Sequence, residues 1–213
     1  MPIKKLPDTI ASQIAAGEVV DRPVSVVKEL VENAIDAGAS EIWVEIRKAG
    51  KELIRVTDNG SGIPAEELEL AVSRHATSKL SRTDDLFDIK TLGFRGEALA
   101  SIGSVSHLKL VSKTEAAQTG AKLTVDGGEN SPVSVAAAPT GTEITVEELF
   151  YNVPARLKFL KKDITEAKHV TGLITRYAMA YPLIRWKLVQ NDLTEFQTSG
   201  NGDRFEILQQ LFG

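Results

Sequence analysis

The chain holds an acid and an amide at a spacing that suits metal and water chemistry. Glu29 and Asn33 stand four positions apart in the segment 28–38, and in a helix two side chains at this spacing lie on the same face. A carboxylate within reach of a water molecule can act as its general base, and an amide oxygen is a suitable ligand for Mg²⁺. The pair also fits an ordinary amphipathic helix with polar residues at its edge, so a second element is needed to indicate a site.

The residues around this pair predict the helix that would position it. Pro23 suits the first helical turn, where its missing N–H has no partner to lose, and Gly38 suits the left-handed position just after the last turn. Six apolar residues recur at three- and four-residue spacing and give one broad apolar face: Val26, Val27, Leu30, Val31, Ala34 and Ile35. Glu29 and Asn33 fall at the border of that face and are expected to be half-sheltered, whereas Glu32 falls on the polar side.

A second acid stands on the apolar face of a predicted strand. In residues 53–58 the side chains alternate, so that Ile54, Val56 and Asp58 share one face. A carboxylate that is buried there without a partner is strongly unfavourable. Asp58 is therefore expected to meet a hydrogen-bond donor.

The turn after this strand allows two interpretations. Asn59 and Gly60 are a good signal for a two-residue hairpin. No matching strand follows, however, because residues 61–64 lead into a helical pattern over 65–73. Glycine at positions 60 and 62 would instead let a ligand approach the backbone closely.

A polar connection follows the second predicted helix. Residues 74–79 offer two cations and two hydroxyls, which include Thr77, Ser78 and Lys79, and the chain stays polar as far as Asp85. A long connection flanked by groups that can bind phosphate fits a lid over a nucleotide. A solvated polar loop is the alternative interpretation.

A glycine-rich segment comes next. Gly93, Phe94, Arg95 and Gly96 precede the small, apolar residues 98–102. A flexible backbone could present free N–H groups at the amino terminus of a helix there, which would suit an anion. The segment is not a P-loop, because G-x-x-x-x-G-K-[ST] occurs nowhere in the chain, and the Rossmann spacing is missing too. A structural glycine bend is the alternative.

Two further elements lie in the second half of the chain. Thr142 follows Gly141 at the start of a predicted strand, where its hydroxyl could meet a base, although a turn before a strand would read the same way. Arg156 belongs to a local basic cluster with Lys158, Lys161 and Lys162. Such clusters are usually solvated helix faces, and a role with DNA or phosphate is the lesser interpretation.

Composition limits the class of protein. The 213 residues are 42% hydrophobic and 25% charged with a formal net charge of −4, which favours neither disorder nor a nucleic-acid-binding domain. The absence of cysteine excludes disulfides and thiolate chemistry, and the three histidines show no metal-ligand spacing. No apolar run approaches the ~20 residues that span a bilayer, and the amino terminus lacks the apolar region of a signal peptide. The cytoplasm is the expected compartment.

The order of elements predicts an α/β (α+β) sandwich, with a mixed, largely antiparallel sheet and helices on one face, because most predicted strands are adjacent in sequence. Strands are expected near 41–47, 52–57, 105–111, 122–125, 133–137, 143–146 and 184–189. Helices are expected near 23–37, 65–73, 96–102, 154–161 and 164–180. Residues 1–200 are expected to form one domain with an arm over 1–20, and residues 203–213 to open a second domain.

Taken in order, these segments resemble the split-ATPase superfamily of DNA gyrase, the large heat-shock chaperone and the histidine kinases, and within it the MutL family of bacterial DNA mismatch-repair ATPases. The resemblance covers most of residues 1–160 and rests on six blocks: 13–20, 29–38, 58–62, 74–79, 93–102 and 150–156. Residues 160–213 carry little that is diagnostic. The resemblance implies the Bergerat-type fold of that superfamily, with ATP and Mg²⁺ as ligands.

The resemblance also implies a role for each candidate residue. Glu29 would be the general base that activates the attacking water, Asn33 would bind Mg²⁺, and Asp58 would accept a hydrogen bond from the adenine amino group. Gly60 and Gly62 would allow close contact with the base and ribose, and Thr142 would help to hold the adenine. The residues implied to contact phosphates in the lid region are Thr77, Ser78, Lys79, Gly93, Phe94, Arg95 and Gly96.

In the MutL family, ATP binding orders the lid and the amino-terminal arm, and two amino-terminal halves then associate. Slow hydrolysis releases them, which couples a MutS-type mismatch sensor to a downstream endonuclease or helicase. For this chain we expect weak contact with DNA, mainly through regions outside these residues. Two alternatives stay open. The chain could be a nucleotide-sensing scaffold without appreciable hydrolysis, since family members draw a phosphate-contacting lysine from the next domain, or it could be a topoisomerase-type or kinase ATPase module.

Overall fold

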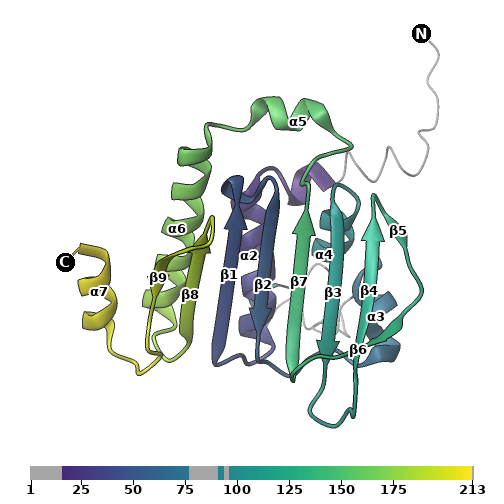
Figure 1. The fold of residues 1–213 in the computed structure, drawn as a ribbon, viewed down its shortest axis with the longest axis horizontal. Coiled ribbons are helices and arrows are strands. Elements are labelled where there is room, and N and C mark those ends of the chain that lie inside the picture. Colours follow the sequence, from purple (N-terminus) through teal and green to yellow (C-terminus); the bar gives the residue numbers. More distant parts are fainter. Residues whose placement is uncertain (1–15, 77–90, 94–95, 213) are drawn as a thin grey trace, which may run out of the picture.

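The computed structural model describes residues 16–76, 91–93 and 96–212. Within these residues the chain forms one nine-stranded sheet with helices α2, α4 and α6 behind it (Figure 1). The strands are β1 (Glu41–Arg47), β2 (Leu53–Asp58), β3 (His107–Lys113), β4 (Gly120–Asp126), β5 (Glu129–Asn130), β6 (Ser134–Ala136), β7 (Gly141–Glu147), β8 (Arg185–Gln190) and β9 (Leu193–Gln197). The α-helices are α2 (Pro23–Asp36), α3 (Leu68–Ala71), α4 (Ala98–Gly103), α5 (Pro154–Phe159), α6 (Asp163–Ala180) and α7 (Arg204–Phe212). Two short 3₁₀ turns are η1 (Lys48–Gly50) and η2 (Ala65–Glu67), and residues 16–19 are also helical.

The sheet is mixed but mainly antiparallel, as predicted. Its order is β5-β4-β3-β7-β2-β1-β8-β9, and β6 pairs with the first three residues of β4. Of the pairs, only β1 with β8 is parallel within the described residues. A parallel neighbour requires a crossover, and α5 and α6 supply it by carrying the chain from β7 past β2 and β1 to β8.

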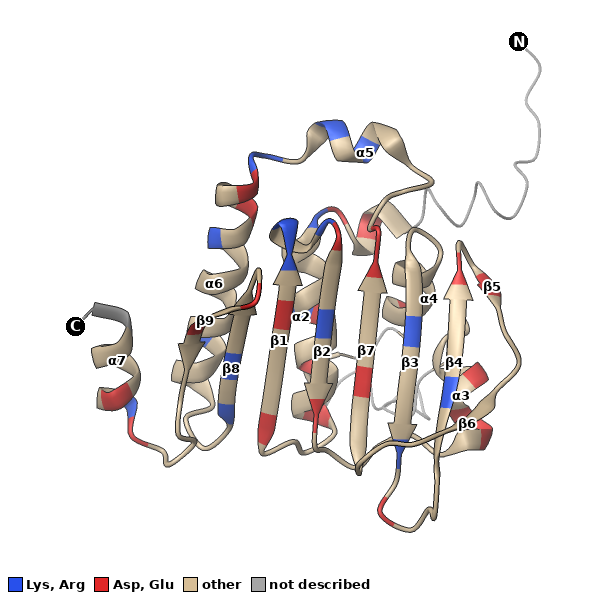
Figure 2. Cartoon of the chain, viewed as in Figure 1, with Lys and Arg blue, Asp and Glu red and all other residues tan. Residues whose placement is uncertain are grey.

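The two faces of the sheet differ in polarity. On β1, Ile42, Val44 and Ile46 are at most 1% exposed and belong to the core that includes the apolar face of α2. Charged residues recur along β1, β2, β7 and β3 (Figure 2), and on β1 the burial pattern places Glu41, Glu45 and Arg47 on the face opposite the core residues. Some of these charges are paired across strands, as in the 3.0 Å contact between Arg55 Nη1 and Glu45 Oε2. In the part of the chain that the structure describes, the fold is therefore two-layered, with helices on one face of the sheet.

The predicted elements match the structure closely in the first half of the chain. The strands expected near 41–47 and 52–57 are β1 and β2, and the helix expected over 23–37 is α2. The expected helix over 65–73 is a 3₁₀ turn followed by the single turn of α3. The short strands β5 and β9 were not predicted. β9 pairs with β8 through a turn at Asn191 and Asp192, where both residues have positive φ and form a tight hairpin without glycine.

Glu32 corrects the expectation for the helix wheel. The side chain was expected on the polar side of α2, yet it is only 7% exposed because α6 packs there. Its carboxylate accepts a 2.6 Å hydrogen bond from the Tyr177 hydroxyl and one of 2.8 Å from Lys28 Nζ. Burial, together with the bond to Glu32, raises the pKa of Tyr177. The polar side of α2 is thus a second packing surface.

We expect Tyr177→Phe to lower the free energy of unfolding by about 1–3 kcal/mol, because it removes one donor from a buried carboxylate and leaves that carboxylate under-satisfied. Urea denaturation measures this change. Tyr151→Phe is the matched control, since its hydroxyl donates at 2.8 Å to the exposed Asp126. The control is expected to change stability by less than about 0.5 kcal/mol. Equal effects of the two changes would contradict the proposed packing role of Glu32.

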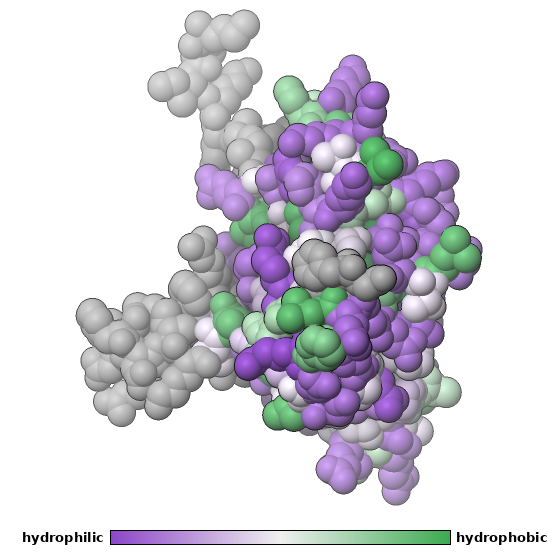
Figure 3. All heavy atoms as spheres, turned by 90° about the vertical axis from the view of Figure 1, so that its left-hand side faces the viewer, coloured by the Kyte–Doolittle hydropathy of each residue, from purple (hydrophilic) through white to green (hydrophobic). Residues whose placement is uncertain are grey.

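Apolar side chains at the end of the sheet near α7 are covered only in part. Figure 3 presents this side of the molecule, which is mainly hydrophilic with smaller hydrophobic groups. Of α7, Ile207 is 2% exposed in the core, whereas Phe205 is 65% exposed. Within the described residues no helix is long and apolar enough to cross a membrane.

Candidate functional site

Helix α2 carries Glu29 and Asn33 one turn apart at the border of its apolar face, as the sequence predicted. Both residues are partly exposed, and 25% of the Glu29 side chain is accessible. Lys28 Nζ lies 3.3 Å from Glu29 Oε1 and 2.8 Å from Glu32 Oε2. Although partial burial lowers it, the pKa of Lys28 is raised overall by these two carboxylates. The Glu29 carboxylate therefore has a cation beside it and is still partly accessible to solvent.

Asp58 at the end of β2 meets the donors that its burial requires. Its Oδ1 accepts a 2.8 Å hydrogen bond from the Gly60 N–H, and the backbone of Thr142 supplies a second one. Burial nevertheless raises the pKa of Asp58, and these two hydrogen bonds only partly oppose the shift. The carboxyl group is therefore a half-buried, oriented acceptor at the end of a strand.

The turn after β2 is not a hairpin. Asn59 Oδ1 accepts 2.9 Å bonds from the N–H groups of Ser40 and Glu41, which fixes the turn to the start of β1. The Ser61 N–H donates at 3.0 Å to the carbonyl of Ala37, just after α2. The Asp58 turn and the helix that carries Glu29 and Asn33 are thereby joined.

Two glycines are required by close backbone contacts. Gly62 has φ +71°, and a Cβ there would lie 2.2 Å from the carbonyl oxygen of Lys113. Gly141 has φ +120°, and its Cβ would lie 2.0 Å from the carbonyl oxygen of Asp58. Both contacts forbid any side chain. They let the turn after β2 pack directly on β3 and β7.

Thr142 lies beside Asp58. The two residues are register partners in the antiparallel pair of β2 and β7, although 84 positions separate them in sequence. Thr142 is 9% exposed, and its Oγ1 lies 2.9 Å from the hydroxyl of Ser112 on β3. The structure thus brings together two of the residues that were expected to hold a base.

Asp36 was missed by sequence reasoning and links α2 to the glycine-rich segment. Its two carboxylate oxygens accept bonds of 3.0 Å from the Leu92 N–H and 3.2 Å from the Gly93 N–H. Asp36 lies one turn after Asn33 and two turns after Glu29, so this spacing could have indicated it. The segment at Gly93 is therefore held against the same helix as the acid–amide pair.

The remaining phosphate candidates are only partly described. Gly96 has φ +61°, and the neighbouring Glu97 Oε1 lies 2.9 Å from His75 Nδ1. This contact places the start of the predicted lid beside the start of α4. Five expected phosphate contacts lie outside the described residues: Thr77, Ser78, Lys79, Phe94 and Arg95.

The basic cluster is only in part a solvated face. Lys158, Lys161 and Lys162 are exposed, but the Arg156 guanidinium lies 5.6 Å from the centre of the Phe150 ring. Burial lowers the pKa of Arg156. A Cβ on Gly17 would lie 2.2 Å from this guanidinium, so Arg156 contacts the end of the predicted arm. Residues 1–15 of that arm lie outside the described residues.

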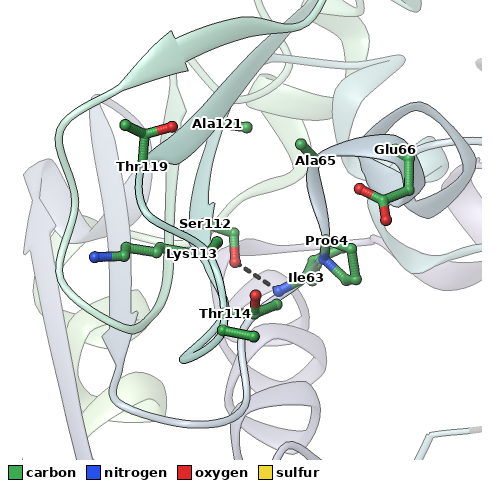
Figure 4. A pocket seen from close by; sticks show the side chains of 11 residues that line it. Ile63, Pro64, Ala65, Glu66, Ser112, Lys113, Thr114, Thr119 and Ala121 are labelled. Atoms are coloured by element: carbon green, nitrogen blue, oxygen red, sulfur yellow. Dashed lines mark hydrogen bonds between the residues drawn. The ribbon is translucent and has the colours of Figure 1, made fainter.

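A cavity of about 260 Å³ lies next to this site but does not contain its acids (Figure 4). It is lined by residues 63–66, by Ser112 near the end of β3 and by the connection from β3 to β4, including Thr119. The hydrogen bonds described above therefore define the candidate site better than the cavity does.

Comparison with known proteins agrees with this geometry. The family described as "Histidine kinase-, DNA gyrase B-, and HSP90-like ATPase" matches residues 22–151, which include every candidate residue from Glu29 to Thr142. The chain is 48% identical over 211 residues to the DNA mismatch repair protein MutL of Halothermothrix orenii, covering 99% of the chain and 33% of that protein. It is 49% identical to MutL of Streptococcus pneumoniae serotype 19F, over 99% of the chain and 32% of that protein. The chain thus spans about a third of the length of these relatives.

Solved structures show the same similarity. The Aquifex aeolicus MutL ATPase domain complexed with ADP superimposes with a TM-score of 0.72 at 36% identity, over 91% of this chain and 70% of that one. The N-terminal domain of a DNA repair protein superimposes with a TM-score of 0.80 at 28% identity, over 95% of this chain and 60% of that one.

Proposed function

Because the chain belongs to the MutL family of DNA mismatch repair proteins, among the histidine kinase-, DNA gyrase B- and HSP90-like ATPases, we propose that it binds ATP and hydrolyses it slowly as a switch in DNA mismatch repair. One observation carries the proposal. The half-buried Asp58 lies beside the buried Thr142, and the turn between β2 and η2 joins this pair to the helix that carries Glu29 and Asn33.

The pair of Asp58 and Thr142 suits the adenine base. Asp58 is held by the backbone N–H groups of Gly60 and Thr142, so its carboxylate is aimed before any ligand arrives. An oriented carboxylate matches the donor character of the 6-amino group of adenine. The Thr142 hydroxyl beside it would hold the same edge of the base, directly or through water. Gly60 and Gly62 would let the base and ribose lie against the backbone.

The acid–amide pair suits the phosphate end. Glu29 is partly exposed and would take a proton from the attacking water. The amide oxygen of Asn33, one turn further along α2, would bind Mg²⁺, which commonly takes one or two protein ligands and completes its shell with waters and phosphate oxygens. When bound, Mg²⁺ would neutralise charge on the phosphates.

The backbone around Gly93 and Gly96 would contact the phosphates together with Thr77, Ser78, Lys79, Phe94 and Arg95. Asp36 supports this placement because it holds the Gly93 segment against α2. In the full protein, nucleotide binding would order residues 1–20 and bring two amino-terminal halves together as a homodimer. Arg156, which contacts Gly17, would connect the arm to the body of the domain.

The partners proposed are a MutS-type mismatch sensor and a downstream endonuclease or helicase, with weak contact to DNA, in the cytoplasm. We propose one ATPase domain over residues 1–200 and the start of a second domain at 203–213. A non-hydrolysing scaffold would bind nucleotide through the same residues, and a topoisomerase-type module would supercoil or relax DNA. Turnover and supercoiling assays separate these alternatives from the proposal.

The direct test is ATP binding by the wild-type chain, measured by calorimetry, together with hydrolysis of labelled ATP under single-turnover conditions. We expect saturable binding of ATP and ADP, and slow release of phosphate that depends on Mg²⁺. Failure to bind either nucleotide would contradict the proposed function. Tight binding without hydrolysis would favour the scaffold.

We expect Asn33→Ala to weaken binding of a non-hydrolysable ATP analogue at least about tenfold in Mg²⁺, by analogy with the loss of groups that support a bound metal. In the presence of EDTA the same change is expected to have a much smaller effect. Asn130→Ala is the matched control, because Asn130 is exposed on the short strand β5. An equal effect of Asn33→Ala with and without Mg²⁺ would exclude Asn33 as a ligand of the metal.

A further inference from the structure

Ser112 is a buried hydroxyl at the meeting point of three segments of the candidate site. It is 1% exposed on β3, where it follows Leu108 and Leu110 on the core face. The Ile63 N–H donates to its Oγ at 2.8 Å, as Figure 4 shows. The same Oγ lies 2.9 Å from the carbonyl oxygen of Gly141 and 2.9 Å from Thr142 Oγ1.

These contacts close a ring of hydrogen bonds around the proposed base pocket. Asp58 is bonded to the backbone of Gly60 and of Thr142. Ser112 connects the same two segments a second time, because it contacts Ile63 in the turn and Thr142 on β7. We propose that Ser112 is a positioning residue that sets the base specificity of this pocket. The proposal rests on the proposed binding of ATP.

The direction of the hydrogen bonds follows from the number of atoms available. A serine hydroxyl has one hydrogen and two acceptor sites. The Ile63 N–H occupies one acceptor site of Ser112, and the Gly141 carbonyl can only accept, so it takes the serine hydrogen. All three contacts are satisfied only if Thr142 donates its own hydrogen to the second acceptor site of Ser112.

In this arrangement the Thr142 hydroxyl has already donated its hydrogen, so it can only accept a hydrogen bond from a ligand. Thr142 and Asp58 are then both acceptors, side by side. Two acceptors side by side can take both hydrogens of a 6-amino group, directly or through water, whereas a 6-oxopurine places an acceptor oxygen at that position. Ser112 would thus discriminate between ATP and ITP without touching either nucleotide.

Other buried serines of this region do not play this part. Ser104 and Ser106 donate at 2.8 and 2.7 Å to carbonyls three and four positions earlier, in α4. Ser112 instead connects segments that are 29 to 49 positions away in sequence. Ser106, which is fully buried, is therefore a matched control for loss of a buried hydroxyl.

Two substitutions at Ser112 form a matched pair. Both add a methyl group at a position that is 1% exposed beside the cavity, so both meet the same packing. Ser112→Thr keeps the hydroxyl and Ser112→Val has nearly the same shape without it. The difference between them isolates the hydrogen bonds from packing.

The experiment measures the Kd of non-hydrolysable ATP and ITP analogues by calorimetry. We expect Ser112→Val to weaken ATP binding about tenfold, consistent with the loss of hydrogen bonds in a buried network. We also expect it to change ITP binding less than about twofold, so the ATP/ITP preference falls about tenfold. Ser112→Thr is expected to restore the preference to within about threefold, and Ser106→Ala to leave it unchanged.

Equal weakening of both analogues, or an unchanged preference in a folded Ser112→Val variant, would overturn the role of Ser112 and leave the proposed function standing. Loss of ATP binding in the wild-type chain would overturn both. Should Ser112→Val not fold, Ser112→Ala is compared with Ser106→Ala by the same ATP/ITP ratio. In a Thr142→Val background the effect at Ser112 is expected to shrink, since the hydroxyl through which it acts is gone.

Discussion

Replacing Glu29 with glutamine is expected to lower ATP turnover by about 10²- to 10⁴-fold, the range that general base catalysis contributes. Glutamine keeps the length and shape of the side chain, but its amide cannot accept the proton of the attacking water. ATP binding is expected to stay within about threefold, because the proposed base contacts lie on β2 and β7 and not on Glu29. Single-turnover hydrolysis of labelled ATP measures the first effect, and calorimetry measures the second.

Glu45→Gln is the matched control for this change. Glu45 lies on the opposite, charged face of the sheet, where it pairs with Arg55 at 3.0 Å. Its replacement is expected to leave turnover within about twofold, as for a surface ion pair remote from the site. Unchanged turnover in Glu29→Gln would exclude Glu29 as the general base. Loss of nucleotide binding in that variant would indicate a binding role instead.

The parts of the site that could be predicted from sequence are those set by local periodicity. The apolar repeat of α2 gave its bounds and placed Glu29 and Asn33 at its border, because the helical period fixes which side chains share a face. The alternation in β2 put Asp58 on the inner face in the same way. The resemblance of the motifs then supplied the chemistry that periodicity could not.

The parts that were missed depend on contacts between distant segments. Asp36 and Ser112 hold backbone N–H groups that are 56 and 49 positions away. The helical spacing could place Asp36 on the face of Asn33, but nothing in the local sequence identifies the distant partner of either residue. Glu32 was misplaced for the same reason, because the helix that buries it starts more than 120 positions later. A helix wheel assigns faces relative to one core and does not foresee a second packing surface.

Replacing Asp58 with asparagine is expected to weaken ATP binding at least about 100-fold. A pocket built to bond a particular group rejects a mismatched one strongly. The asparagine oxygen can still accept the Gly60 N–H, which turns its NH₂ group toward the ligand, where it would face the amino group of adenine, donor against donor. ITP carries an acceptor at that position, so its affinity relative to ATP is expected to rise. Asp126→Asn is the matched control, since Asp126 also ends a strand but its side chain is 69% exposed.

The pH dependence of the Asp58→Asn variant separates binding from folding. Burial raises the pKa of Asp58 in the folded chain, so its acceptor is lost at a higher pH than for an exposed aspartate. ATP affinity of the wild type should therefore fall as pH falls through that raised pKa, and the variant should lack this step.

The stability of the free protein depends on pH in the opposite direction. A carboxyl whose folded pKa is raised contributes stability below its unfolded pKa and loses it as pH rises through the folded value. At neutral pH the ionised Asp58 is thus less favourable in the folded chain than its protonated form would be. A variant that binds ATP like the wild type, or that keeps the pH step in ATP affinity, would contradict the assignment of Asp58 as the acceptor for the base.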